Sequence, residues 1–209
     1  HPPIDEVRKL TKQIIAGLRA FERKEMVHQD LKPENIMLTH NGLVKILDFG
    51  TVLIAGGQEM NSPLDKSVPQ GSVNYIAPEY LMGLTGSHQS DLFSLAVIVY
   101  EMITGRLPYP DRSPKAAKLQ YYSELNYTPS KSYRADVPVW VEAALQTGLS
   151  ANPDHRYRSL SEFFHDLSTP NRSLEAKLSQ RPMMERNPLR CWQLIATISM
   201  VFNVLQWIG

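Results

Sequence analysis

The chain has 209 residues, of which 43% are hydrophobic and 21% are charged, so its composition is that of a globular protein and excludes wholesale disorder. Its 22 Lys and Arg against 21 Asp and Glu leave a net charge of +1, which gives no general reason to expect a nucleic-acid-binding protein. The single cysteine, Cys191, excludes an internal disulfide and a cysteine-rich zinc site, and the length predicts one domain with or without an appendage.

A helix and a hairpin are predicted at the start of the chain. The helix covers residues 6–23, with Asp5 placed to cap it and with apolar residues at helical spacing, namely Val7, Leu10, Ile14, Leu18 and Phe21. Two short apolar runs, 35–38 and 43–47, then flank an Asn41-Gly42 pair. Because both residues of this pair tolerate a positive φ, the pattern predicts a β-hairpin.

Residues 51–71 lose the apolar period and read as one long loop, rich in glycine, proline and asparagine. After Ser90-Asp91, the run 92–103 is apolar on nearly every face and predicts a helix buried all round that ends at Gly105. A further helix is predicted around 140–149. Another follows the capping box formed by Ser159 and Glu162. A small hairpin followed by a mostly helical mass predicts an α+β fold.

The last forty residues differ in character from the rest of the chain. Residues 170–190 combine prolines with basic side chains and read as a basic linker, whereas residues 191–209 carry no charge. At 1.5 Å rise per residue, 19 residues cover about 28 Å, close to the roughly 30 Å hydrocarbon core of a bilayer. The tail is therefore predicted to be a transmembrane helix, with Trp192 and Trp207 near its ends. The alternative is an amphipathic helix that docks on the protein or lies at the membrane surface.

Three motifs in the first half of the chain contain the candidate catalytic and metal-binding residues. They are Val27-His28-Gln29-Asp30-Leu31-Lys32-Pro33-Glu34-Asn35, then Asp48-Phe49-Gly50 at the end of the hairpin, and Ala77-Pro78-Glu79 at the end of the long loop. In this order they resemble the catalytic loop, the metal-binding loop and the end of the activation segment of protein kinases. The resemblance implies a protein-kinase-like C-terminal lobe over residues 1–169, with a basic linker over 170–190.

The resemblance assigns phosphoryl-transfer roles to four residues. Asp30 would accept the proton of the acceptor hydroxyl, and Lys32 would offset charge on the moving phosphoryl group of ATP. Asn35 and Asp48 would hold Mg²⁺, a hard cation that prefers oxygen ligands. ATP and Mg²⁺ are thus the expected cofactors. The alternative is that Asp30 and Asp48 are solvated turn carboxylates.

Further matches to the kinase pattern are structural. His28 would bond backbone near the metal loop, and Asp91 would anchor the catalytic loop from the central helix. Phe49 and Gly50 complete the metal loop. Ser72 occupies a hydroxyl position that bonds the catalytic Asp and Lys in many such kinases, although it also reads as an ordinary loop serine. The resemblance also implies an ion pair between Glu79 and Arg156 that ties the activation segment to the helical lobe.

Substrate class follows from Leu31-Lys32-Pro33-Glu34-Asn35, which looks like the serine/threonine version of the loop and implies protein substrates phosphorylated on Ser or Thr. Gln29 departs from the pattern, because the usual arginine reads a phosphate on the activation loop. We therefore expect activity without activation-loop phosphorylation. This would be wrong if alanine at Thr51, Ser62 and Ser67 abolished turnover.

The kinase pattern also has parts with no counterpart here. No glycine-rich loop or strand lysine precedes Asp30, and the chain begins at His1 rather than at methionine, so we expect a large-lobe piece of a longer kinase, inactive alone. The alternative is a kinase-like binding or scaffold module at the membrane.

A narrower resemblance comes from three blocks, Pro78–Gly83, Arg156–Phe163 and Glu185–Gln193. They are similar to bacterial bifunctional serine/threonine kinase–phosphatases, in which a phosphatase domain precedes the kinase and a hydrophobic helix follows it. The resemblance implies a single-pass protein of the bacterial inner membrane that contacts lipid through residues 191–209. Arg186 and Arg190, just before the tail, predict that the kinase lobe is cytoplasmic. Because the net charge is balanced, no nucleic-acid partner is expected.

Overall fold

The computed structural model describes residues 2–47, 53–54, 72–110, 125–174, 176, 192–193 and 195–200. The chain divides into two compact units, residues 1–170 and 171–209. The first unit is mostly helical, with two small antiparallel sheets. The α+β expectation is confirmed in this unit.

Helix α1 (Ile4–Glu22) opens the first unit and presents a buried face that includes Val7, Ile14 and Leu18. The prediction that Asp5 caps it is wrong. Pro3 occupies the cap position without a side-chain bond, and Asp5 lies inside the first turn, 2.9 Å from the Arg8 guanidinium. The two prolines already hold the chain in the conformation that enters a helix, so the helix begins before Asp5 can cap it.

The predicted hairpin is confirmed as strands β2 (Ile36–Leu38) and β3 (Val44–Ile46), which pair antiparallel with Ile36 opposite Ile46. Of the Asn41-Gly42 pair, only Gly42 takes a positive φ, at 78°. Residues 39–43 close the turn instead through the Thr39 hydroxyl, which accepts from Leu43 N. The connection between the strands is thus residues 39–43, one residue longer than the gap between the two predicted runs.

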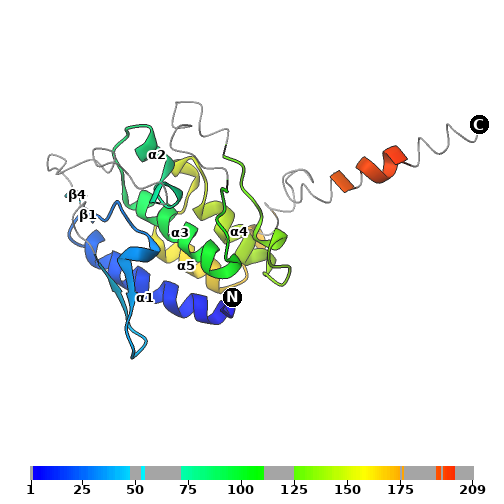
Figure 1. Cartoon of the computed structure of the whole chain (residues 1–209). Helices are drawn as coiled ribbons and strands as arrows, with labels where there is room; N and C mark the ends of the chain where they lie inside the picture. The colour runs from blue at the N-terminus through cyan, green and yellow to red at the C-terminus, as the bar shows by residue number, and fades with distance from the viewer. Residues whose placement is uncertain are drawn as a thin grey trace, which may run out of the picture. The chain divides into compact units, whose positions relative to one another are not determined.

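The hairpin packs on α1 (Figure 1). A Cβ on Gly17 would lie 2.7 Å from the terminal methyl of Ile46, so any larger residue here would require the Ile46 side chain to move. Gln13 joins the two elements through both ends of its amide, donating to Gly42 O and accepting from Val44 N. The hairpin is thus fixed in place on the helix that precedes the catalytic loop.

A second pair of strands was missed by the sequence analysis. Strand β1 (Met26–Val27) pairs with β4 (Leu53–Ile54), which lies inside the segment predicted to be loop throughout. The 3-10 turns η1 (Pro33–Asn35) and η2 (Ser72–Asn74) follow β1 and precede helix α2 (Pro78–Leu81). Two-residue strands carry too short a pattern to be recognised without their partner.

Helix α3 (His88–Thr104) forms the centre of the first unit and contacts both α1 and α4 (Figure 1). The prediction of a helix buried on nearly all faces is confirmed, and it ends at Gly105 with φ of 65°. It begins earlier than expected because Ser87 caps it, in a capping box with Ser90. Nearly every residue from Ser90 to Tyr100 is buried.

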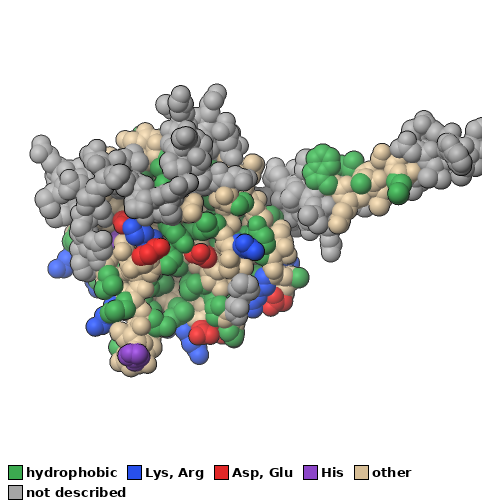
Figure 2. Space-filling model, in the orientation of Figure 1, with side chains coloured by type: hydrophobic (Ala, Val, Ile, Leu, Met, Phe, Trp, Pro, Cys, Tyr) green, Lys and Arg blue, Asp and Glu red, His purple; other side chains and the backbone are tan. Residues whose placement is uncertain are grey.

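Helices α4 (Val139–Gly148) and α5 (Leu160–Ser168) complete the core, joined by turn η6 (Pro153–His155), and turn η5 (Ser130–Ser132) precedes α4. Ser159 caps α5, as predicted, by accepting from Glu162 N. The Glu162 carboxylate accepts from Arg158 N, so only half of the predicted capping box is formed as expected. Apolar side chains also reach the surface on the face shown in Figure 2, and the hairpin exposes Met37, Leu38 and Leu43.

The second unit contains short helical stretches at 192–193 and 195–200. Within the part of the chain that the structure describes, no helix has the length and apolar character that crossing a bilayer requires. Most of the predicted span 191–209, and most of the basic linker 170–190, lie outside the described residues.

Candidate functional site

The backbone of the candidate catalytic loop is held from α3 by Asp91. Its two carboxylate oxygens accept from His28 N at 2.7 Å and from Gln29 N at 2.9 Å. Asp91 is only 4% exposed, and Gln29 takes a positive φ of 69°, so the loop turns sharply at the point where it is anchored. Burial raises the pKa of Asp91 to about 7, although the two backbone donors favour the carboxylate.

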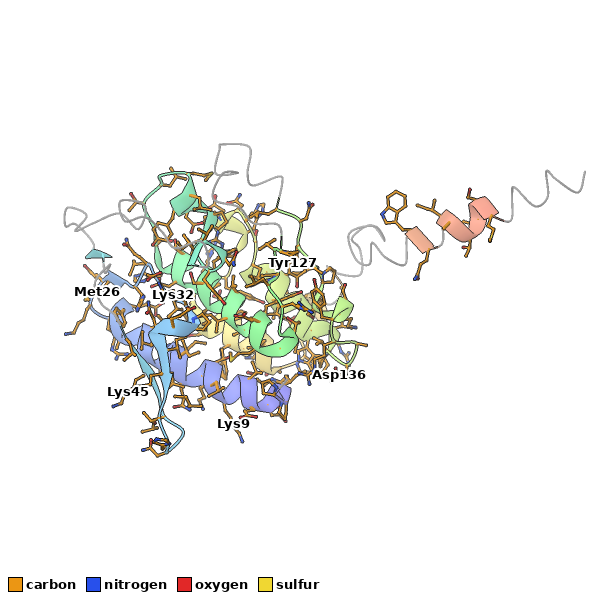
Figure 3. All side chains as sticks on the ribbon, viewed as in Figure 1. Lys9, Met26, Lys32, Lys45, Tyr127 and Asp136 are labelled. Atoms are coloured by element: carbon orange, nitrogen blue, oxygen red, sulfur yellow. The ribbon has the colours of Figure 1, made fainter. Side chains whose placement is uncertain are left out.

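Three predicted site residues meet just after this anchor. The Lys32 ammonium lies 2.6 Å from the Asp30 carboxylate, and the Asn35 amide nitrogen donates to the Asp30 backbone carbonyl at 2.7 Å. The same nitrogen also lies 3.2 Å from the Asp30 carboxylate. Turn η1 brings Asn35 back to Asp30, and Figure 3 shows Lys32 on the loop between β1 and the hairpin. The two predicted catalytic residues, Asp30 and Lys32, and the predicted metal ligand Asn35 are thus brought together by one short loop.

This geometry fits an oxygen-seeking cation at Asn35. Because the Asn35 nitrogen is committed to Asp30, its amide oxygen is the end available to a metal. The second predicted ligand, Asp48, lies outside the described residues together with Phe49 and Gly50. Among the residues that are described, no cluster of three His, Cys, Asp or Glu forms a metal site. The metal-binding role therefore stays a prediction for both residues.

His28 connects the loop to the strand that leads to Asp48. Its Nε2 lies 3.2 Å from Leu47 O, and its ring packs against Phe21 with centroids 5.4 Å apart. Because a carbonyl only accepts, this contact requires the proton on Nε2. Leu47 N in turn donates to Asn35 O at 2.8 Å. These contacts fix the end of β3 beside the catalytic loop, which agrees with a structural rather than a chemical role for His28.

Ser72 begins turn η2, but its side chain lies outside the described residues. The predicted bonds from its hydroxyl to Asp30 and Lys32 therefore stay a prediction.

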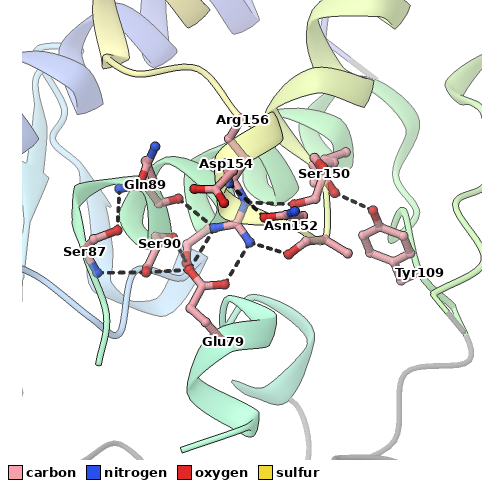
Figure 4. Close-up of polar contacts among 12 residues, drawn as sticks. Glu79, Ser87, Gln89, Ser90, Tyr109, Ser150, Asn152, Asp154 and Arg156 are labelled. Carbon is pink, nitrogen blue, oxygen red and sulfur yellow. Dashed lines mark hydrogen bonds and ion pairs between the residues drawn. The ribbon is translucent and has the colours of Figure 1, made fainter. Parts of the chain in front are cut away.

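Glu79 and Arg156, 77 residues apart in sequence, form a two-armed ion pair (Figure 4). Both guanidinium nitrogens lie 2.8 Å from a Glu79 oxygen, and the two side chains are 5% exposed or less. Arg156 also donates to three backbone carbonyls, those of Gln89, Ser150 and Ala151, and lies over the Phe93 ring. The pair is therefore fully satisfied inside the protein.

Ser90 joins this pair to the start of α3. Its hydroxyl donates to Glu79 at 2.6 Å and accepts from Ser87 N at 2.9 Å. Burial disfavours the charge on Glu79, but the hydrogen bonds and charge of Arg156 outweigh it and hold the pKa of that carboxyl below its ordinary value. The sequence analysis did not identify Ser90, because its hydroxyl reads as part of a helix cap.

A pocket of about 500 Å³ beside the catalytic loop was also missed. It contains two carboxylates, Glu34 and Glu101, and the Tyr75 hydroxyl donates to Glu101 at 2.7 Å. Burial, and after it the neighbouring Glu101, raise the pKa of Tyr75. No lysine, arginine or histidine belongs to its described lining, so the pocket is acidic with apolar walls. Only folding brings these three side chains together, since they come from separate elements.

Comparison with known proteins gives a consistent result. The protein kinase domain family matches residues 3–186. The serine/threonine-protein kinase PknB of Mycolicibacterium smegmatis is 36% identical over 142 residues, which cover 68% of this chain and 22% of that protein. PrkC of Bacillus subtilis, also named a serine/threonine-protein kinase, is 30% identical over 170 residues, or 81% of this chain and 25% of its own length.

A third relative, the serine/threonine-protein kinase PksC of Streptomyces coelicolor, is 33% identical over 157 residues, or 75% of this chain and 28% of its own length. The chain spans about a quarter of the length of the curated relatives it matches. The family match extends over most of the chain and includes the loop from His28 to Asn35 and the Glu79–Arg156 pair. The chain belongs to the protein kinase domain family.

Proposed function

We propose that the protein of which these residues form part transfers the γ-phosphoryl group of ATP to serine or threonine hydroxyls of proteins. The observation that carries the proposal is the meeting of Asp30, Lys32 and Asn35 on one loop anchored by Asp91. Phosphoryl transfer requires positioning and charge neutralisation more than covalent chemistry, and this group is suited to both. The named serine/threonine kinases among its relatives support the substrate class.

Each residue has a definite task in this proposal. Asp30 accepts the proton of the acceptor hydroxyl, and Lys32 stabilises negative charge on the transferred group. Asn35 and Asp48 would hold Mg²⁺, which neutralises the nucleotide phosphates when bound. Asp91 and His28 keep the loop in place through the contacts described above. The acidic pocket at Glu34 and Glu101 favours substrates with a basic side chain near the acceptor hydroxyl.

The same proposal includes a dependence on residues beyond this chain. Residues 1–209 carry no glycine-rich loop or strand lysine ahead of Asp30 to hold the nucleotide phosphates. We therefore expect negligible phosphoryl transfer by these residues alone. Robust Mg²⁺-dependent autophosphorylation by the 209-residue chain would contradict this expectation.

Replacement of Asp30 tests the proposed function in the complete protein. Asp30→Asn keeps the shape of the side chain but removes the base, so phosphorylation of serine peptides should fall by a factor of about 100 or more. The assay follows phosphate transfer from labelled ATP to peptides with arginine or glutamate beside the serine. The matched control is Asp154→Asn, an exposed aspartate in turn η6. Equal rates for Asp30→Asn and wild type would contradict the proposal.

We further propose that residues 191–209 attach the protein to a bacterial membrane with the kinase lobe in the cytoplasm. Their 19 uncharged residues after a basic stretch support this. Fractionation of cells that express the chain with and without residues 191–209 tests it. Equal amounts of both in the soluble fraction would contradict it.

A further inference from the structure

A groove lies between α1 and α5, which pack against each other in the first unit. Its volume is about 390 Å³. Helix α1 contributes Lys12, Ile15, Ala16 and Arg19, and the opposite wall comes from Ser161, Phe164, His165, Ser168 and Thr169. None of these residues belongs to the catalytic loop or to the Glu79–Arg156 pair. The groove is therefore a feature that the proposed function does not use.

The shape of the groove follows from the spacing along α1. Lys12, Ala16 and Arg19 are separated by four and three residues, so they lie in one row on the helix surface. The middle position of the row carries only a methyl group, which leaves a slot between two long basic side chains. Ile15, which is 4% exposed, and the half-buried Phe164 form the apolar floor of the groove.

The charged side chains in the described lining of the groove are all basic. Lys12 and Arg19 line it together with His165, and no aspartate or glutamate belongs to its described lining. Arg19 donates to the Ser161 hydroxyl, and no described carboxylate lies within ion-pair distance of Lys12 or Arg19. The acidic residues of α5, Glu162 and Asp166, line the neighbouring cavity beside Tyr157 instead.

One polar atom in the groove also lacks a partner. The Ser168 hydroxyl oxygen is buried and makes no hydrogen bond among the described residues. Buried hydroxyl groups are nearly always hydrogen-bonded, so this atom is a place where a ligand can supply the missing bond. It lies in the same lining as the apolar floor and the two cations.

We propose that the α1–α5 groove docks a peptide segment of a partner protein that presents a bulky apolar side chain beside Asp or Glu. The apolar side chain fills the slot at Ala16, and the carboxylate meets Lys12 and Arg19. Docking at this groove recruits a partner or substrate and is independent of the chemistry at Asp30.

Charge and shape favour an acidic, partly apolar peptide in the groove over the chain's own linker and over a lipid bilayer. The chain's own basic linker, 170–190, carries five Lys and Arg against two Glu, so it is repelled by the same cations. A flat anionic bilayer contacts exposed side chains but does not reach a floor as deep as Ile15. An acidic, partly apolar peptide satisfies both features of the groove.

Binding of a defined peptide to the 209-residue chain tests the proposal. The probe is a fluorescein-labelled peptide of about twelve residues with alternating Leu and Glu pairs, and its partner probe has Lys in place of each Glu. Fluorescence anisotropy should show saturable binding of the acidic probe and at least about tenfold weaker binding of the basic one. Absence of saturable binding of the acidic probe up to about 1 mM overturns the proposal.

Two variants locate the binding. The double change Lys12→Glu with Arg19→Glu reverses the charge, and Ala16→Trp fills the slot; each should weaken binding at least about tenfold. Lys45→Glu, on the exposed edge of β3 (Figure 3), is the control and should leave binding within about twofold. Circular dichroism and melting midpoints confirm that each variant is folded.

Three outcomes would overturn the assignment. Unchanged affinity in Ala16→Trp, when that variant is folded, would place the peptide elsewhere. Equal loss in Lys45→Glu would show a general charge effect. Displacement of the peptide by phosphatidylserine vesicles, but not by phosphatidylcholine vesicles, would show a membrane contact in place of a peptide site. Because the readout is binding, failure here leaves the proposed kinase activity untouched.

Discussion

Two buried carboxylates close to the start of α3 anchor two different segments, and they do so by different chemistry. Asp91 holds the catalytic loop through two backbone N–H groups and forms no ion pair within the described part of the chain. The Arg156 guanidinium, in contrast, forms an ion pair with both oxygens of Glu79. Burial raises the pKa of Asp91, whereas Arg156 overcomes burial and lowers the pKa of Glu79.

The difference shows that burial alone does not set the charge of an anchoring carboxylate. Backbone donors offset only part of the free energy that burial costs a charged carboxylate. A paired cation offsets more than that cost, so it favours the charged form. The anchor of the catalytic loop thus contributes less stability as pH rises from about 4 to about 7. The segment that contains Glu79 is held by an anchor that fails only in acid.

Removal of the guanidinium should have the largest effect. Arg156→Ala leaves Glu79 buried without a cation and should lower the free energy of unfolding by about 3–5 kcal/mol. Chemical denaturation of the 209-residue chain measures it. Arg158→Ala, an exposed neighbour, is the control and should change stability by about 0.5 kcal/mol or less. Identical unfolding midpoints for Arg156→Ala and wild type would show that the pair does not stabilise the fold.

The pH dependence of Asp91 should come next. Its folded pKa of about 7 lies above the unfolded value of 3.8, so its contribution is fully present below about pH 4 and is lost as pH rises toward 7. The stability advantage of wild type over Asp91→Asn should therefore shrink by up to about 4 kcal/mol between pH 4 and pH 8. Denaturation at several pH values measures this difference. A difference that grows with pH would mean that the two backbone donors outweigh burial.

Loss of the Ser90 hydroxyl should have an intermediate effect. Ser90→Ala removes the bond to Glu79 and one half of the α3 capping box, and should destabilise the chain by about 1–3 kcal/mol. Ser94→Ala is the control, since Ser94 is also buried on α3 and, among the described residues, its hydroxyl donates only to Ser90 O in the same helix. If both variants had the same melting midpoint, Ser90 would not connect the helix start to the ion pair.

Protonation of Glu79 should have the smallest effect on stability at neutral pH, because it occurs only in acid. Its folded pKa is lowered, so its contribution is present above about pH 4.5 and is lost as pH falls through the folded pKa. The loss is about 1.4 kcal/mol for each pKa unit by which folding lowers it. In Glu79→Gln, the free energy of unfolding should fall less steeply as pH is lowered, which measurements between pH 2 and pH 6 would show. An equally steep fall in the variant and in wild type would mean that other carboxylates cause the acid sensitivity.

Much of the fold could be predicted because it depends on local rules. The helix at α1 follows from apolar spacing, and the hairpin follows from two β-prone runs around Gly42. The end of α3 at Gly105 follows from the need for a positive φ. The same rules failed where two local signals compete, as at Pro3 and Asp5, or where a strand is only two residues long, as in β4.

The residues of the candidate site could be named from the sequence, but their contacts could not. The motif around Asp30 contains Lys32 and Asn35, and the structure brings these side chains together, while their roles in phosphoryl transfer stay predictions. Ser90, Tyr75 and Glu101 were not found, since each acts through a partner from another element. No local pattern marks such a residue before the chain is folded.

The sequence by itself determined the family, the residues of the candidate catalytic loop and most element positions, because these depend on residue types at short separations. The tertiary structure decided which carboxylate meets a cation, which meets only backbone, and where α1 and α5 leave a basic groove. Those contacts join residues from about 60 to about 150 positions apart, and only packing brings such groups within hydrogen-bonding distance.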